Sequence, residues 1–214
     1  MLVFVVLHMG GNMVAFAGSG AFNAYARSLR EVGAPVLGEE TLLWVARVVL
    51  VAALALHLAA HLAIMNEPSG DPWQLPTRDR ESFADSPPYV GMPPWYATLP
   101  VAWLQATGVL IAVFVAFHIA QLTIGATHPA FVPGDPYRNL VVALGFWPVS
   151  IAYILAAVAV GAHLLPGTWS AMRSLGLMRP GTEALAAALS ASIPLMVTFG
   201  MAAVPFAVLL GVLS

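Results

Sequence analysis

Five long apolar runs constrain this chain more than any other feature of its sequence. They occupy residues 1–16, 42–65, 101–124, 140–165 and 183–213. A helix needs about 20 apolar residues to cross a hydrocarbon core of about 30 Å, and all the runs but the first reach that length. Because a backbone in lipid must satisfy its own hydrogen bonds, the runs predict an all-α integral membrane protein with five transmembrane helices. The first run is short, so we expect natural residues upstream of Met1.

The scarcity of charge supports the same class. Only 8% of the 214 residues are charged and 60% are hydrophobic, whereas soluble domains carry about 25% charged residues. The net charge of −2 does not indicate a surface that binds nucleic acid. The sequence has no Cys, so these residues supply neither disulfides nor thiolate ligands for an iron–sulfur cluster or a haem. Six His remain as candidate metal or haem ligands.

Polar loops separate the apolar runs. Residues 17–41 include an amphipathic stretch at 22–29, and residues 66–100 are rich in Pro and acidic side chains, as expected of an extramembrane docking loop. Residues 125–139 form a short loop, and residues 166–182 are expected to form an amphipathic stretch at the membrane interface. The Arg residues are balanced between the two sides, so charge leaves the orientation open.

The histidines fall into two levels of the predicted bundle. His8 and His118 lie near the ends of the first and third runs, which meet the same side of the membrane. His57, His61 and His163 lie towards the other side. A b-type haem takes one imidazole on each side of its iron, from facing helices of a bundle. The two levels therefore favour two bis-histidine haems, although a membrane histidine can equally hydrogen-bond between helices.

Small residues surround these histidines and would let a flat macrocycle approach the backbone, although they also serve plain helix packing. They are Gly10, Gly11, Ala53, Ala59, Ala60, Gly161 and Ala162. The sixth histidine, His128, precedes Pro129 in a loop, and we expect it at the surface.

Two other classes compete with a haem protein. The spacing His8-x-x-x-Asn12 followed by AGSGA resembles the motifs of rhomboid proteases, but Ser19 follows Asn12 by only seven residues and has no evident base to activate it. A non-haem transporter could instead carry polar histidines along a pathway. That class predicts no absorbance in the visible.

Longer stretches point to one family. They are LHMGGN, SGAFNAYARSLR, RVVLVAALALHLAAHLAIMN, VAFHIAQLTIGATHPAFVPGDPYRNLV and YILAAVAVGAHLLPGTWSAMRSLG. In these stretches the chain resembles the single-chain, five-helix dihaem cytochrome b membrane anchor of bacterial succinate dehydrogenase and fumarate reductase, respiratory complex II. The resemblance covers nearly the whole chain and is weakest in loop 66–100. It implies one transmembrane cytochrome b domain over residues 1–214, whose first four helices form the haem-binding bundle.

The resemblance implies one ligand to haem iron from each of the first four helices. His8 and His118 would hold the distal haem b, and His57 and His163 the proximal haem b. Depth alone pairs His61 with His163 equally well, but the phrase LALHLAAHLAIMN aligns His57 with the family ligand.

The chain departs from the family pattern near the fourth ligand. Pro166 stands where relatives often have another His or a small residue, and we expect it to kink the helix just past His163. Gly161 and Ala162 occupy the neighbourhood where some relatives carry an acidic residue for transmembrane proton movement. The resemblance therefore does not imply that proton role for this chain.

The function implied by the resemblance is that of the membrane-anchor cytochrome b subunit of succinate:quinone oxidoreductase, an enzyme of the respiratory chain and the tricarboxylic acid cycle. Electrons would pass from a flavoprotein subunit, through an iron–sulfur subunit and this chain, to a membrane quinone, with menaquinone expected. The chain itself would supply no catalytic residue. It would lie in the bacterial inner membrane, with its soluble partners on the cytoplasmic side at loops 66–100 and 166–182. The alternative within this class is a dihaem anchor of another dehydrogenase, such as formate dehydrogenase or a hydrogenase.

Haem propionates and the quinone would need polar partners, and arginine pairs well with carboxylates. The candidates are Arg27, Arg30 and Arg47 at the distal level, and His61, Ser170 and Arg173 at the proximal level. A quinone pocket would lie near Glu39, Glu40, Trp44 and Arg47, or near Trp169 and Ser170. The competing explanation is that the arginines reach towards lipid headgroups and the tryptophans belong to an interfacial belt.

Overall fold

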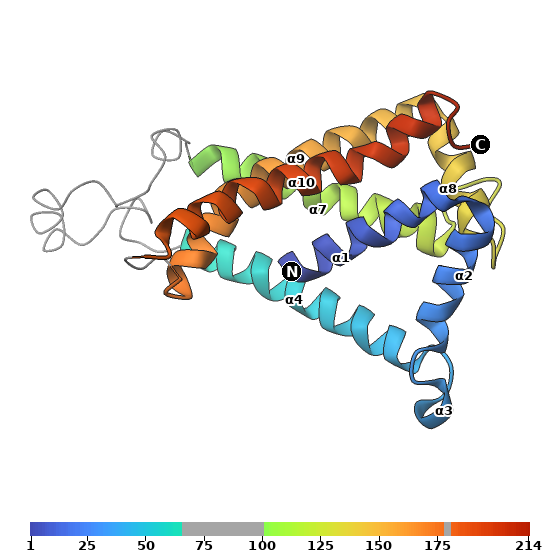
Figure 1. Ribbon diagram of the computed structural model, residues 1–214, viewed down its shortest axis with the longest axis horizontal. Helices are drawn as coiled ribbons and strands as arrows, with labels where there is room; N and C mark the ends of the chain where they lie inside the picture. Colours follow the sequence, from blue (N-terminus) through green and yellow to red (C-terminus); the bar gives the residue numbers. More distant parts are fainter. Residues whose placement is uncertain (66–100, 178–180) are drawn as a thin grey trace, which may run out of the picture. The chain divides into compact units, whose positions relative to one another are not determined.

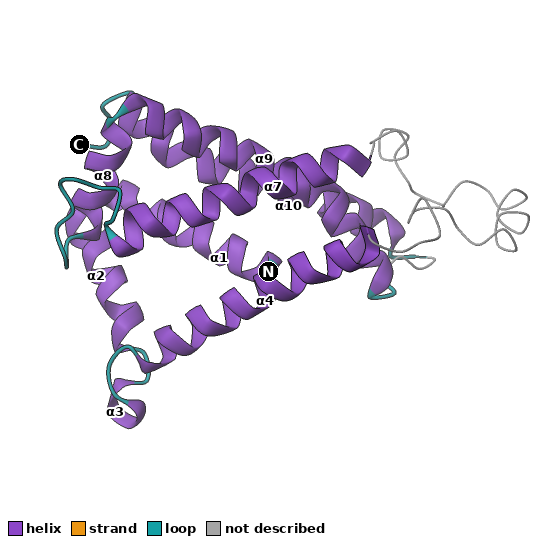
Figure 2. Cartoon of the chain, turned by 180° about the vertical axis from the view of Figure 1, so that it is seen from behind, coloured by secondary structure: helices purple, strands orange, loops and turns teal. Residues whose placement is uncertain are grey.

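The structure is a computed structural model that describes residues 1–65, 101–177 and 181–214, without the side chains of residues 64, 65, 101, 102 and 183. All regular elements within these residues are helices (Figures 1 and 2). Five helical stretches among them are long and apolar enough to cross a membrane. The prediction of an all-helical chain with five membrane-length helices is therefore confirmed.

The chain divides into two compact units. Of the described residues, unit 1 comprises Met1 and residues 28–65, and unit 2 comprises residues 2–27, 101–177 and 181–214. The described helices of unit 1 are α3 (Ala34–Leu37) and α4 (Thr41–Met65). Unit 2 contains α1 (Leu2–Met13), η1 (Val14–Ala17), α7 (Val101–His118), the π-helix η2 (Ile119–Ile124), α8 (Pro136–Gly145), α9 (Trp147–Ser174) and α10 (Glu183–Leu209). Helix α2 (Gly18–Glu31) begins in unit 2 and ends in unit 1.

Within unit 2, α9 packs against α7 and α10, and α1 packs against α10 (Figure 1). Glycines allow two of these close approaches. A Cβ atom at Gly161 of α9 would overlap the Thr198 side chain of α10, and one at Gly200 of α10 would overlap Met9 of α1. Gly161 therefore serves helix packing, which is one of the two roles that the sequence left open for the small residues.

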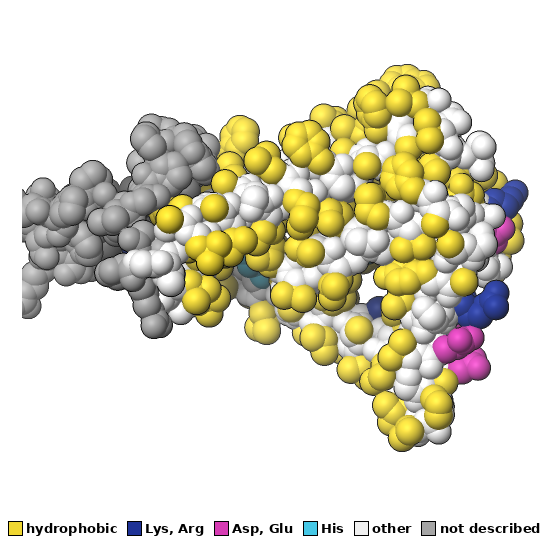
Figure 3. Space-filling view, viewed as in Figure 1, with side chains coloured by type: hydrophobic (Ala, Val, Ile, Leu, Met, Phe, Trp, Pro, Cys, Tyr) yellow, Lys and Arg dark blue, Asp and Glu magenta, His cyan; other side chains and the backbone are white. Residues whose placement is uncertain are grey.

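The outer surfaces of the helices are apolar. Figure 3 shows hydrophobic side chains over the visible helix surfaces. In unit 2, Val113 of α7 is 67% exposed and Phe199 of α10 is 70% exposed. Exposed apolar side chains in such numbers do not suit contact with water, so lipid is the environment that fits these helices.

The buried core of unit 2 lies where η1 and α2 meet α8 and the C-terminal part of α10. Its members are Ala15, Phe22, Leu140, Leu144, Val204, Ala207, Val208 and Leu213. The Asn23 side chain joins α2 to the start of α8, because its Nδ2 donates to Asp135 Oδ1 at 2.9 Å and its Oδ1 accepts from Tyr137 N at 3.0 Å. Asp135 caps α8 by accepting from Arg138 N at 3.1 Å. The hydrogen bond from Asn23, followed by that from Arg138 N, lowers the pKa of the Asp135 carboxyl.

The loop before α8 is held by side chains that point inward. Asn139 exchanges two hydrogen bonds of 2.8 Å with the backbone of Val132. His128 is buried, and its Nε2 lies 2.9 Å from the carbonyl oxygen of Asn139. The expectation that His128 lies at the surface is therefore wrong, because its ring satisfies a backbone carbonyl inside the loop.

The fourth predicted span, 140–165, differs from the observed helices at both ends. Its first residues belong to α8, and the chain turns at Phe146 before α9 begins at Trp147. Pro148 suits the first turn of a helix, and Ser150 Oγ satisfies the Leu144 carbonyl at 2.6 Å. At the other end, α9 continues through Pro166 to Ser174, where the sequence predicted an interfacial stretch from residue 166. The predicted docking loop 66–100 lies outside the described residues.

Candidate functional site: histidines at two levels of unit 2

His8 of α1 and His118 of α7 face each other. Their ring centroids are 5.8 Å apart and their planes are inclined at 78°. Phe4 stacks on His8 at 5.4 Å and Phe114 stacks on His118 at 5.9 Å. The structure thus brings together the two histidines that the depth argument assigned to one level, and aromatic rings flank the pair.

The separation of these rings matches the requirement of a bis-histidine haem. Two imidazoles on opposite sides of one iron, each at a metal–nitrogen distance of about 2 Å, have ring centroids about 6 Å apart. The observed separation is 5.8 Å. Rotation of each ring about its metal–nitrogen bond leaves the angle between the planes unrestricted. Zinc sites in proteins usually take three or four protein ligands, and within the described residues no group of three or more His, Cys, Asp or Glu is placed to hold a metal ion.

The His118 ring is held by a polar network inside the helix pair α7–α9. Its Nδ1 lies 3.2 Å from the Tyr153 hydroxyl. That hydroxyl donates to Gln121 Oε1 at 2.9 Å, and Gln121, in the π-helix η2, is buried. The Tyr153 ring packs edge-on against Phe114 at 4.8 Å. Such outer partners fix the orientation of a ligating histidine.

His163 of α9 makes the corresponding contact with α7. Its Nδ1 lies 3.2 Å from Thr107 Oγ1. Gly108, next to Thr107, brings the α7 backbone close to the ring, because a Cβ atom there would lie 3.4 Å from His163 Cε1. Each of the helices α7 and α9 therefore carries one histidine and supplies the hydroxyl group that contacts the other helix's histidine.

These contacts define two levels along α7 and α9. Thr107 and His118 are separated by about three turns of α7, and Tyr153 and His163 by about three turns of α9. The two contacts therefore lie about 15 Å apart along antiparallel helices, at about 1.5 Å per residue. His8 and His118 mark one level and His163 marks the other, in agreement with the sequence-based sorting.

The remaining predicted ligand candidates, His57 and His61, lie on α4 in unit 1. They are one helical turn apart and so share a face of α4. The pairing of either with His163 of unit 2, and the choice between them, stays a prediction.

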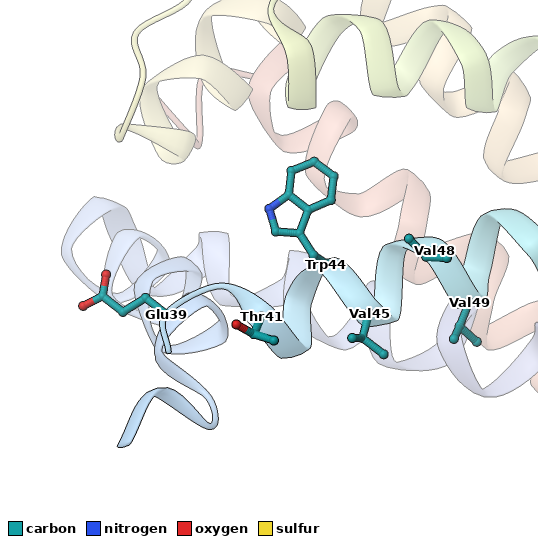
Figure 4. Close-up of a pocket in the computed structure, with 6 residues that line it drawn as sticks. All are labelled: Glu39, Thr41, Trp44, Val45, Val48 and Val49. Carbon is teal, nitrogen blue, oxygen red and sulfur yellow. The ribbon is translucent and has the colours of Figure 1, made fainter. Parts of the chain in front are cut away.

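The predicted propionate candidates of unit 1 have local partners. Arg30 Nε lies 3.7 Å from Glu40 Oε1, and the Arg47 guanidinium lies 4.6 Å from the Trp44 ring centroid. An open pocket of about 480 Å³ borders this region and contains Glu39 and Trp44 of the predicted quinone contacts (Figure 4). Its other lining residues are Thr41, Val45, Val48 and Val49.

The other predicted contact residues lie on α2 and α9. Arg27 is exposed on α2, and Ser170 and Arg173 lie on α9, two to three turns beyond His163. Trp169 is buried in α9, so it is not an interfacial belt residue. Gly11 makes room for the Tyr25 ring, against which a Cβ atom would clash, whereas a Cβ atom at Gly10 would meet nothing within 4 Å.

The protease motif gains no support from these positions. Asn12 Nδ2 contacts Met201 Sδ of α10 at 3.6 Å. Ser19 is exposed at the start of α2, while the ring contacts of His8 are with Phe4 and His118. The histidine is thus engaged away from the serine.

Comparison with known proteins gives no match among protein-family models, curated proteins or solved structures.

Sequence reasoning missed the residues that contact the histidines. Thr107, Gln121 and Tyr153 are polar groups inside predicted spans, and a polar group in lipid by itself indicates a role. Counting turns along two antiparallel helices would have paired Tyr153 with His118 and Thr107 with His163. The depth argument could therefore have placed these residues at the levels of the histidines, but it does not determine which side of each helix they occupy.

Proposed function

We propose that this chain is a dihaem cytochrome b membrane anchor, of the type found in bacterial succinate dehydrogenase and fumarate reductase. In this role it accepts electrons from an iron–sulfur subunit and delivers them to a membrane quinone. The single observation that carries the proposal is the opposed pair of His8 and His118, whose rings are 5.8 Å apart within an apolar helix bundle.

The proposal gives each residue the following role. His8 and His118 bind the distal haem b, and His163 binds the proximal haem b together with His57. Each haem, when bound, supplies a one-electron carrier whose potential depends on its axial ligands, burial and hydrogen bonds. The bundle fixes the spacing of the ligands and excludes water, and Tyr153 and Thr107 orient the rings.

A histidine at a second level of the bundle supports the proposal of two haems rather than one. His163 and its partner Thr107 lie about 15 Å along the bundle from His118 and Tyr153, at about 1.5 Å per residue. Two haems at this spacing would lie one towards each face of a bilayer of about 30 Å, which suits transfer of electrons across the membrane. The pocket beside Trp44 and Glu39 is our candidate for the quinone.

Ligand replacement tests the proposal directly. In the full chain, His8→Ala and His118→Ala should each remove the same one of two haems, and His163→Ala should remove the other. His128→Gln is the matched control, because its amide can still donate to the Asn139 carbonyl, and it should keep both haems. Haem counts that are equal in the wild type and in all three ligand variants would overturn the proposal.

The soluble partner needs its own experiment. Membranes containing the tagged chain with its native partners should reduce a quinone analogue when given succinate, and the purified complex should contain flavin and iron–sulfur subunits. Reduction by formate or hydrogen, without reduction by succinate, would instead assign the chain to another respiratory dehydrogenase with the same haem arrangement.

A further inference from the structure

The contacts of the His118 and His163 rings with hydroxyl groups indicate which ring nitrogen carries the proton, as well as how each ring is oriented. A neutral imidazole carries its proton on one ring nitrogen, and a hydroxyl has a single proton to donate. The nitrogen that holds the proton cannot bind a metal, so the tautomer of a histidine decides which nitrogen is available. The direction of each hydrogen bond therefore matters at both levels.

At the level of His118 the direction follows from Gln121. The Tyr153 hydroxyl donates its one proton to Gln121 Oε1 at 2.9 Å. Its oxygen can then only accept from the His118 ring, so the contact of 3.2 Å is a hydrogen bond from Nδ1–H to the phenol oxygen. The lone pair of the neutral His118 ring therefore lies on Nε2.

At the level of His163 the same argument applies to Thr107. The Thr107 hydroxyl donates to its own helix, to the Trp103 carbonyl at 2.8 Å and more weakly to the Leu104 carbonyl at 3.2 Å. Its oxygen accepts from His163 Nδ1 at 3.2 Å. The two helices thus use different hydroxyl groups to reach the same proton arrangement.

We propose that Tyr153 and Thr107 are positioning residues that hold His118 and His163 with the proton on Nδ1, so that Nε2 of each ring is the nitrogen that binds iron. This inference rests on the proposed function. It adds that the two haems are tuned separately: Tyr153 with buried Gln121 acts on the distal haem, and Thr107 acts on the proximal haem.

The expected consequence is a change in reduction potential. A hydrogen bond from Nδ1–H to an oxygen acceptor makes the imidazole a more basic ligand, which favours ferric over ferrous iron and lowers the potential. Tyr153→Phe removes the acceptor oxygen and keeps the ring that packs on Phe114. Thr107→Val removes the other acceptor with little change in shape.

The test is a potentiometric titration of both haems in the purified full chain, followed by visible spectroscopy. Tyr153→Phe should shift the distal haem to a more positive potential and leave the proximal haem unchanged, and Thr107→Val should do the reverse. Tyr137→Phe is the matched control, because the ring contact of Tyr137 is with Phe22, and it should shift neither haem.

The outcomes separate this inference from the proposed function. A wild-type chain without haem overturns the proposed function. Haem-containing variants with wild-type potentials, or variants in which both haems shift equally, overturn the inference alone. If Tyr153→Phe fails to assemble, Thr107→Val decides by the same criterion at the proximal haem.

Discussion

Replacement of Gly161 by Ala should destabilise the packing of α9 on α10. A Cβ atom at Gly161 would overlap the Thr198 hydroxyl, and it would lie 3.1 Å from Thr198 Cβ and 3.3 Å from the Pro194 carbonyl oxygen. Overpacking of this kind costs about 1–3 kcal/mol. The change from Gly to Ala inside a helix also contributes a favourable term of about 1 kcal/mol, which partly offsets the clash.

Gly167→Ala is the control that separates the cost of the clash from the favourable effect of Ala on the helix. It lies in the same helix, and a Cβ atom there would meet nothing within 4 Å. Gly167→Ala should therefore show the favourable helix term alone, and the unfolding free energies of the two variants should differ by about 1–3 kcal/mol. The assay is equilibrium unfolding of the purified chain in mixed micelles as the SDS fraction rises.

Thr198→Ala supplies the second half of the test, because it removes the hydroxyl that the new methyl group meets. The double variant Gly161→Ala/Thr198→Ala should recover part of the loss, with a coupling energy of about 0.5–3 kcal/mol between the two sites. Equal stabilisation by Gly161→Ala and Gly167→Ala, with no coupling to Thr198, would refute the close approach of α9 and α10 at this point.

Three further predictions concern the loop, the turn after the π-helix and the ring geometry. Hydrogen bonds lower the pKa of Asp135 in the folded chain, so their contribution to stability is present above the ordinary Asp pKa and is lost as the pH falls through the lowered value. Acidification should therefore increase protease cleavage of loop 125–139 in the wild type, and Asn23→Ala should weaken that pH dependence, because only the hydrogen bond from Arg138 N then remains. Gly125→Ala should destabilise the chain by about 1–3 kcal/mol in SDS unfolding, because Gly125 has a φ of +79° and faces the Phe131 ring; unchanged stability would contradict the turn. If His8 and His118 bind the proposed distal haem at their 78° angle, its ferric form should give a highly anisotropic low-spin EPR signal, because near-perpendicular imidazoles leave two iron d orbitals close in energy. A rhombic signal typical of parallel rings would contradict this geometry.

The sequence predicted the membrane-length helices well because lipid leaves few alternatives to a helix. The sequence did not predict the two ends of the fourth span, which depend on local interactions. The break at Phe146 depends on Pro148 and on a hydrogen bond from Ser150 to the Leu144 carbonyl, which apolar content does not reveal. Helix α9 continues through Pro166 for a different reason. Unwinding a helix in an apolar environment would expose backbone groups that no water satisfies.

The sequence predicted the levels of the histidines along the helices, but it did not predict which residues contact their rings. Counting residues from the helix ends placed His8 and His118 at one level, and their rings do meet. The partners Tyr153 and Gln121 depend on the rotation of α9 about its axis and on the π-helix η2, neither of which periodicity determines. Gly11 was expected beside a cofactor, and the structure uses it to admit Tyr25 of the next helix.

The most direct test of the central claim is a count of haem in the purified full chain. A reduced-minus-oxidised visible spectrum with pyridine haemochrome quantification should give two haems b per chain. A chain that is folded in detergent and shows no haem absorbance would contradict the cytochrome assignment and favour a non-haem membrane transporter.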